Sequence, residues 1–113
     1  MTHQVVFHID DLAKWQHALG NVANLITFGQ ATNQDYQIVV LVNGDAILGY
    51  LENQLRATIA ELTSQAVQFH ACQNAMNSHS VKKDQLPAHV KIVPAGVADL
   101  ISLQEAGYAY IKP

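Results

Sequence analysis

The residue best suited to covalent chemistry is Cys72, the only cysteine among the 113 residues. It follows a short β-prone run, 67–70, and the polar residues Gln73 and Asn74 come directly after it. A lone cysteine excludes an intrachain disulfide or dithiol cycle, so we expect a free thiol in a reducing compartment. The thiolate form of a cysteine is a nucleophile. The pattern therefore predicts a chemically reactive thiol at a strand end.

A structural role for Cys72 stays open, because free cysteines often serve as small buried apolar side chains. The polar residues that flank it favour an exposed thiol. A helix that begins near Asn74 would direct backbone N–H groups and the positive end of its dipole at the sulfur. His70 could add positive charge if it lies on the same face of the strand. Both interpretations of Cys72 are kept at this point.

Other candidate residues follow the remaining predicted strands. In open parallel sheets, ligand sites gather beyond the carboxyl ends of the strands. If every strand is parallel, that edge of the sheet collects one set of candidate binding positions: His8, Asp10, Asn43, Gly44, His70, Asn74 and Gly96. His8 interrupts an apolar run, which favours a buried, hydrogen-bonded histidine over a ligand contact. Asp10 and Asp11 are first of all suited to capping a helix.

Several other kinds of site lack a motif in this chain. A metal site can be drawn from His8, His70 and Cys72, but no compact ligand spacing such as C-x-x-C or H-E-x-x-H supports it. The glycines form neither G-x-G-x-x-G nor a P-loop, and no nucleophile elbow is present for a hydrolase. We therefore expect neither a metal ion nor a cofactor.

The elements that must position these residues alternate along the chain. Apolar runs predict strands at 5–9, 36–42, 67–70, 90–93 and 108–111. Helical spacing of apolar residues predicts helices from Asp11 to about Ile26, over about 53–64, and from 96 to a C-terminal glycine at 107. The stretch from Gly29 to Asp35 is polar and turn-rich. Two short helical pieces are expected within 74–86, near Ala75-Met76 and near 82–86.

The resulting order, βαβαβαβαβ, predicts one α/β domain over residues 1–113, with a mostly parallel sheet and helices on both faces. Asn43-Gly44 could form a hairpin turn, but the residues after it are poor in β-branched side chains. We therefore expect a loop at the strand end that leads into a helix.

Composition bears on partners and location. The chain is 50% hydrophobic and only 13% charged, whereas about a quarter of residues are charged in typical soluble domains. Part of the surface is therefore expected to be buried against other subunits. The net charge of -3 and the scattered Lys and Arg residues argue against nucleic acid. No secretory signal or apolar run of membrane-spanning length is visible, so we expect a cytosolic protein without membrane contact.

Five segments carry a family resemblance: VVFHIDD at 5–11, NVANL at 21–25, VNGD at 42–45, ACQNAM at 71–76 and VPAGVADLISLQEAGYAYIKP at 93–113. In this order and spacing they resemble the DsrE/DsrF-like proteins, specifically the small stand-alone members. The resemblance implies a three-layer αβα fold around a five-stranded parallel sheet, the DsrEFH-like fold. It also implies assembly as homo-oligomers, usually trimers or hexamers.

Members of that family with an established role carry sulfur as a cysteine persulfide, in relays with dedicated donor and acceptor proteins. The matching position here is Cys72. The resemblance thus implies a persulfide carrier, a possible sulfurtransferase. From their place at the strand end, His70 and Asn74 are expected to shape the pocket. The alternative is a non-catalytic homo-oligomer that binds a small molecule or a protein at the same edge, with Cys72 lining the pocket. Fold transfers between relatives more readily than function.

Overall fold

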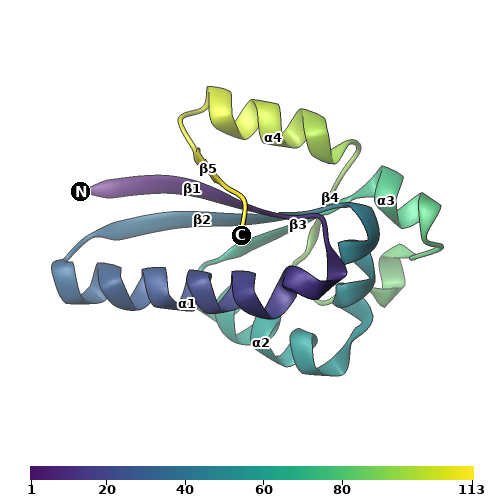
Figure 1. The fold of residues 1–113 in the computed structure, drawn as a ribbon, viewed down its shortest axis with the longest axis horizontal. Helices are drawn as coiled ribbons and strands as arrows, with labels where there is room; N and C mark the ends of the chain where they lie inside the picture. The colour runs from purple at the N-terminus through teal and green to yellow at the C-terminus, as the bar shows by residue number, and fades with distance from the viewer.

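The computed structural model describes all residues 1–113 and shows a five-stranded sheet between helices (Figure 1). Its strands are β1 (Thr2–Ile9), β2 (Asp35–Val42), β3 (Gln68–Cys72), β4 (Lys91–Val93) and β5 (Ala109–Ile111). Its helices are α1 (Trp15–Thr32), α2 (Asn53–Ser64), α3 (Gln73–Ser78) and α4 (Gly96–Glu105), with 3-10 turns η1 (Leu12–Lys14), η2 (Gly44–Leu51) and η3 (Lys83–Gln85).

The sheet order is β4-β3-β2-β1-β5, and every neighbouring pair of strands is parallel. In Figure 1, α4 lies on one face of the sheet while α1 and α2 lie on the other. This arrangement confirms the predicted three-layer α/β fold. Because all strands are parallel, their carboxyl ends share one edge of the sheet, where the candidate site was expected. No helix has the length and hydropathy needed to cross a bilayer.

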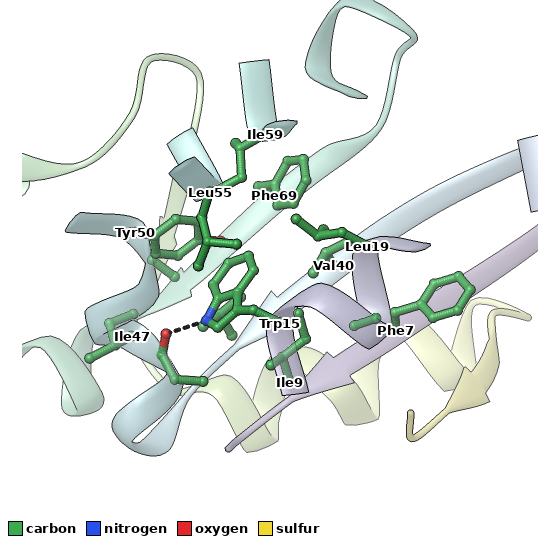
Figure 2. Packing of buried hydrophobic residues seen from close by; sticks show 14 of the residues in the cluster. Phe7, Ile9, Trp15, Leu19, Val40, Ile47, Tyr50, Leu55, Ile59 and Phe69 are labelled. Carbon is green, nitrogen blue, oxygen red and sulfur yellow. Dashed lines mark hydrogen bonds between the residues drawn. The ribbon is translucent and has the colours of Figure 1, made fainter. Parts of the chain in front are cut away.

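The larger core fills the space between the sheet and the helices α1 and α2 (Figure 2). Trp15 is fully buried there, donates its indole N–H to the carbonyl of Ala46 at 2.8 Å and meets the ring of Tyr50 edge-on. The Tyr50 hydroxyl donates to the carbonyl of His70 at 2.8 Å, and burial raises the pKa of Tyr50 well above its ordinary value. These bonds hold η2 against α1 and against β3, next to the site.

A smaller core lies beneath α4 on the opposite face of the sheet, formed by Val6, Val39, Leu41, Val93 and Leu100. Strand alternation places the even-numbered β1 side chains and the odd-numbered β2 side chains on this face. His8 in β1 and His70 in β3 are the two buried polar residues of the protein, and both lie on the side covered by α4. The α4 layer therefore covers polar as well as apolar groups.

One boundary prediction was wrong. Residues 29–35 were expected to form a turn, but α1 continues through Gly29 and ends only at Thr32. Gly29 is buried, and a Cβ there would lie 2.6 Å from the carbonyl oxygen of Gln34 and 3.0 Å from the Tyr36 ring. The glycine thus allows close packing inside the helix. The helix ends instead at Asn33, in the left-handed conformation with φ 57.

The predictions for the turn after β2 and for the short helical pieces were confirmed. Asn43 and Gly44 begin η2 and form no hairpin, and short helical pieces occur at α3 and η3 as expected. Gly107, with φ +101, follows the end of α4. Strand β3 extends two residues past the predicted end at 70, so that it includes Cys72. The thiol therefore lies on the last residue of a strand, with no intervening loop.

Candidate functional site

Cys72 ends β3 and directly precedes α3. Strand β4 pairs with it, because the register joins Cys72 to Val93. Ala75 and Met76 of α3 belong to the same buried cluster. Only 5% of the cysteine is exposed, so the expectation of an exposed thiol was wrong for the isolated chain. Regular pairing up to the last residue of the strand, followed at once by a helix, explains this burial.

The Cys72 sulfur accepts a hydrogen bond from the backbone N–H of Gly96, with 3.2 Å between nitrogen and Sγ. Gly96 is the first residue of α4, so its N–H belongs to the helix N-terminus, where the dipole is positive. The sequence predicted such a contact from a helix near Asn74. The structure provides it from α4, which follows the neighbouring strand.

The glycine at position 96 permits this close approach. A Cβ on Gly96 would lie 3.2 Å from the Cβ of Cys72 and 3.3 Å from the Cβ of Asn43. Carbon atoms pack best at about 3.5–4.0 Å. The missing side chain therefore lets the first turn of α4 come within hydrogen-bonding distance of the thiol.

An open pocket of about 330 Å³ adjoins the thiol. Its lining includes Cys72 and four of the predicted binding positions, which are Asn43, Gly44, Asn74 and Gly96. The predictions did not include Ser78 and His79, at the end of α3, which also line it. Helical spacing was the available signal, because Ser78 follows Asn74 by four residues on a short helix.

His70 lies on the same face as Cys72, as strand alternation predicted, but it does not line the pocket. Its Nδ1 is 2.7 Å from Oδ2 of Asp99, and the imidazole is buried. Asp99 is in the first turn of α4. The pair therefore anchors that turn to the sheet, so His70 supports the position of Gly96. Sequence reasoning missed Asp99, although its place three residues after Gly96 marks it as a first-turn residue.

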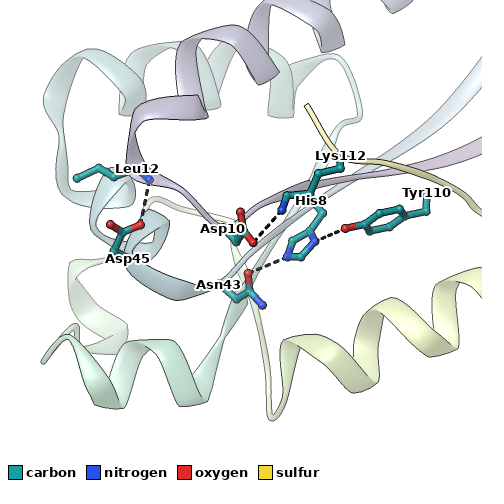
Figure 3. A network of polar contacts seen from close by, with 7 residues as sticks. All are labelled: His8, Asp10, Leu12, Asn43, Asp45, Tyr110 and Lys112. Atoms are coloured by element: carbon teal, nitrogen blue, oxygen red, sulfur yellow. Dashed lines mark hydrogen bonds and ion pairs between the residues drawn. The ribbon is translucent and has the colours of Figure 1, made fainter.

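His8 is buried and hydrogen-bonded at both ring nitrogens (Figure 3). Its Nε2 lies 2.8 Å from Oδ1 of Asn43, and its Nδ1 lies 2.5 Å from the hydroxyl oxygen of Tyr110. Asn43 in turn lines the Cys72 pocket. The structure thus places His8 behind the pocket and connects it to the pocket through Asn43.

Asp10 lies outside the pocket and forms an ion pair with Lys112 at 2.9 Å (Figure 3). The hydrogen bond from Lys112 is the main cause that lowers the pKa of Asp10 below its ordinary value, and the same bond raises the pKa of Lys112. The neighbouring Asp11 caps η1 by accepting a bond from the N–H of Ala13 at 2.9 Å. Asp10 therefore ties the carboxyl end of β1 to the segment after β5.

No group of three or more His, Cys, Asp or Glu side chains is arranged to hold a metal ion. His8 bonds to Asn43 and Tyr110. His70 bonds to Asp99, and Cys72 bonds to Gly96. The structure does not bring these three residues together as one ligand set.

The DsrE/DsrF-like family model matches residues 5–113, nearly the whole chain. The chain belongs to this family. DsrE-like proteins are associated in general with sulfur relay, and they often form oligomers. No protein in the comparison with curated proteins matches this DsrE/DsrF-like chain.

The solved structures that resemble this DsrE/DsrF-like protein include two that match over nearly its whole length. The first is a protein of unknown function, MTH1491 from Methanobacterium thermoautotrophicum, with 30% sequence identity and a TM-score of 0.88 over 98% of this chain and 99% of that one. The second is the ychN protein from E. coli, with 16% identity and a TM-score of 0.73 over 100% of both chains. The second similarity supports the fold alone.

Proposed function

We propose that this protein carries sulfane sulfur as a persulfide on Cys72, in a sulfur relay. The observation that carries the proposal is the hydrogen bond from the Gly96 N–H to the Cys72 sulfur, beside an open pocket that both residues line. A helix N-terminus favours negative charge, which both a thiolate and a persulfide anion bear. The other lining residues include amides and a hydroxyl, and none is Lys or Arg.

The proposed loading step is a sulfur transfer between thiols. The Cys72 thiolate attacks the outer sulfur of a donor persulfide, R–S–SH, and a new S–S bond forms while the donor S–S bond breaks. The donor leaves as the thiolate R–S⁻, and Cys72 holds –S–SH. Atoms and charge balance without an external oxidant or reductant. Unloading is the same reaction with an acceptor thiolate as the nucleophile.

The burial of Cys72 is compatible with this role because the pocket lies beside the sulfur. A donor has to bring only one sulfur atom into the cavity of about 330 Å³. The donor and acceptor partners are proposed to be proteins that dock at this edge of the sheet. By passing sulfur from donor to acceptor in this way, the protein would act as a sulfurtransferase.

Intact-mass measurement tests the carrier function. The purified, reduced protein is incubated with a small-molecule persulfide donor and compared with the Cys72→Ser variant, while a known persulfide carrier serves as the positive control. We expect a mass gain of one sulfur in the wild type and none in the variant. If Cys72 stays unmodified under conditions that load the control, the carrier function is wrong. The alternative, a binding module whose pocket Cys72 merely lines, would then be favoured.

We also propose a cytosolic homo-oligomer, a trimer or a hexamer. Support comes from the low charged fraction of 13% and from apolar side chains on the outer side of α4, where Val97 is 63% and Ile101 is 52% exposed. Isolated apolar side chains are common on monomers, so the grouping on one helix is what matters. Light scattering with size-exclusion chromatography measures the subunit number, and a monomer at micromolar concentration would refute the assembly.

A further inference from the structure

A chain of hydrogen bonds leads from Tyr110 through His8 to Asn43 (Figure 3). Asn43 lines the Cys72 pocket, so the chain ends there. Its parts come from β5, β1 and the residue directly after β2. Tyr110 is 40% exposed, whereas His8 is 9% exposed. The chain therefore runs from the surface, through a buried imidazole, to a residue of the candidate site.

The direction of these bonds follows from the atoms involved. Oδ1 of Asn43 can only accept, so the bond at 2.8 Å requires the proton of His8 to be on Nε2. In a neutral imidazole Nδ1 then has a lone pair, and the Tyr110 hydroxyl donates to it. The Tyr110 hydroxyl can thus donate to Nδ1 in the tautomer whose Nε2–H donates to Asn43. Each bond in the chain points from the surface toward the pocket.

The amide nitrogen of Asn43 is the free end of this chain. Nδ2 makes no hydrogen bond within the protein, and no buried side-chain nitrogen or oxygen lacks a partner, so this Nδ2 is open to solvent. Figure 3 shows it turned away from the imidazole. Because the N–H of His8 donates to Oδ1, rotation of the Asn43 amide by half a turn would place the amide N–H group against the Nε2–H of His8. His8 therefore selects one of the two amide orientations.

Asn43 and Cys72 are neighbours across the sheet. The register pairs Val42 with Ala71, and one further residue along each parallel strand brings Asn43 beside Cys72. Both residues pack against Gly96 and both line the pocket. A second sulfur attached to Cys72 would extend into this pocket, where the N–H of Gly96 already serves the first sulfur. The outer sulfur would therefore need a separate donor.

We propose that the Asn43 amide N–H binds the outer sulfur of the Cys72 persulfide, and that His8 and Tyr110 are positioning residues that hold this amide in the donating orientation. The inference rests on the proposed carrier function and assigns the residues that stabilise the loaded state. A neutral donor suits a carrier, because it stabilises the persulfide anion without the permanent ion pair that Lys or Arg would form. The sulfur can then be passed on.

Nuclear magnetic resonance of the histidine rings tests the hydrogen-bond chain without any loading reaction. Long-range correlations of ¹⁵N-labelled protein identify which ring nitrogen carries the proton, and the His8 signals are assigned by their loss in His8→Gln. We expect the Nε2–H tautomer at neutral pH, and we expect Tyr110→Phe to shift the Nδ1 resonance of His8. An Nδ1–H tautomer would reverse the bonds, present the Asn43 oxygen to the pocket and overturn the proposal.

Persulfide loading of Asn43→Asp tests the role of the amide itself. The aspartate keeps an acceptor for His8 but replaces the free N–H group with a second oxygen. We expect a folded protein whose loaded fraction at equilibrium falls about tenfold or more, since a hydrogen bond to a charged group is lost and a like charge is added. Asn24→Asp, on the exposed surface of α1, is the control for added charge and should load as the wild type does.

The outcomes separate the two claims. If the wild type accepts no sulfur, the carrier function fails, and the role of Asn43 fails with it. If the wild type loads and Asn43→Asp loads equally well, the role of Asn43 is wrong while the carrier function stands. Because the aspartate also adds a negative charge beside Cys72, Tyr110→Phe, which adds none, separates loss of the oriented amide from charge repulsion. Tyr110→Phe should reduce loading by less than Asn43→Asp, since it weakens only the orientation.

Discussion

Substitution of Gly96 by alanine tests the close approach of α4 to the thiol. The added Cβ would lie 3.2 Å from the Cβ of Cys72, 3.3 Å from the Cβ of Asn43 and 3.3 Å from Cδ1 of Leu41. Leu41 can rotate away, but the other two Cβ atoms are attached directly to the backbone, of the last residue of β3 and of the residue after β2. To reach the usual separation of about 3.5–4.0 Å, the first turn of α4 has to move outward by a few tenths of an ångström.

The expected cost follows from this overlap. Extra carbon atoms in a packed interior typically cost about 1–3 kcal/mol, so we expect a decrease of that size in the free energy of unfolding. Outward movement of α4 also lengthens the bond from the Gly96 N–H to the Cys72 sulfur, now 3.2 Å. Persulfide loading should therefore fall together with stability.

Gly20→Ala is the matched control. Gly20 lies exposed within α1, with no atom within 4 Å of the position a Cβ would take. Alanine in a helix interior is more favourable than glycine by about 0.5–1 kcal/mol, so this variant should gain stability. Urea unfolding followed by circular dichroism measures both changes. If Gly96→Ala matches Gly20→Ala in stability and also loads sulfur normally, the packing of α4 on Cys72 described here is wrong.

Variants at three further positions test contacts in and around the site. Gly49→Ala would place a methyl group in steric overlap with the ring of buried Trp15. We expect a loss of stability of about 3 kcal/mol or more, with altered tryptophan fluorescence. Unchanged stability would contradict this packing. Asp99→Ala leaves the buried Nδ1 of its histidine partner unpaired and should cost about 1–3 kcal/mol. Asp99→Asn keeps an acceptor, so an equal loss in both variants would argue against the bond. Lys112→Met removes the main cause of the lowered pKa of Asp10, which should rise toward 3.8. The pKa of Asp10 is lower in the folded protein than in the unfolded chain, so the ion pair stabilises the fold at pH values above the ordinary pKa of 3.8. This stabilisation is lost as the pH falls through the lowered pKa of the folded protein. Carboxyl titration by NMR measures this pKa, and an unchanged value in the variant would exclude the ion pair in solution.

The sequence contained enough information for the fold because the strands and helices have distinct periodicities. The runs that became β1 and β2 are apolar on both faces, which indicates parallel strands between helices. The alternation of these runs with helical spacing was sufficient for the three-layer arrangement. The error at residues 29–35 arose because a glycine that permits tight packing looks the same in sequence as a glycine that permits a turn.

The site was less predictable, because its geometry depends on contacts between distant segments. Strand ends could be read from the sequence, so Cys72, Asn43 and Gly96 were expected at one edge. Which helix supplies the N–H group to the sulfur depends on the crossover from β4 to α4, and local pattern carries no information about it. The partners Asp99 and Tyr110 were missed as site-supporting residues for the same reason, since each bonds to a histidine far away along the chain.

The sheet order also bears on how the protein folds. The bond between His8 and Asn43 spans 35 residues, whereas the bond between His8 and Tyr110 spans 102. Since closing a longer loop costs more entropy, β2 should pair with β1 before β5 does. Until β5 arrives, one side of β1 presents unpaired backbone groups, which can recruit strands from other chains. Even afterwards β5 pairs with only Val5, Val6 and Phe7 of β1. Slow or incomplete docking of β5 would therefore favour aggregation during folding.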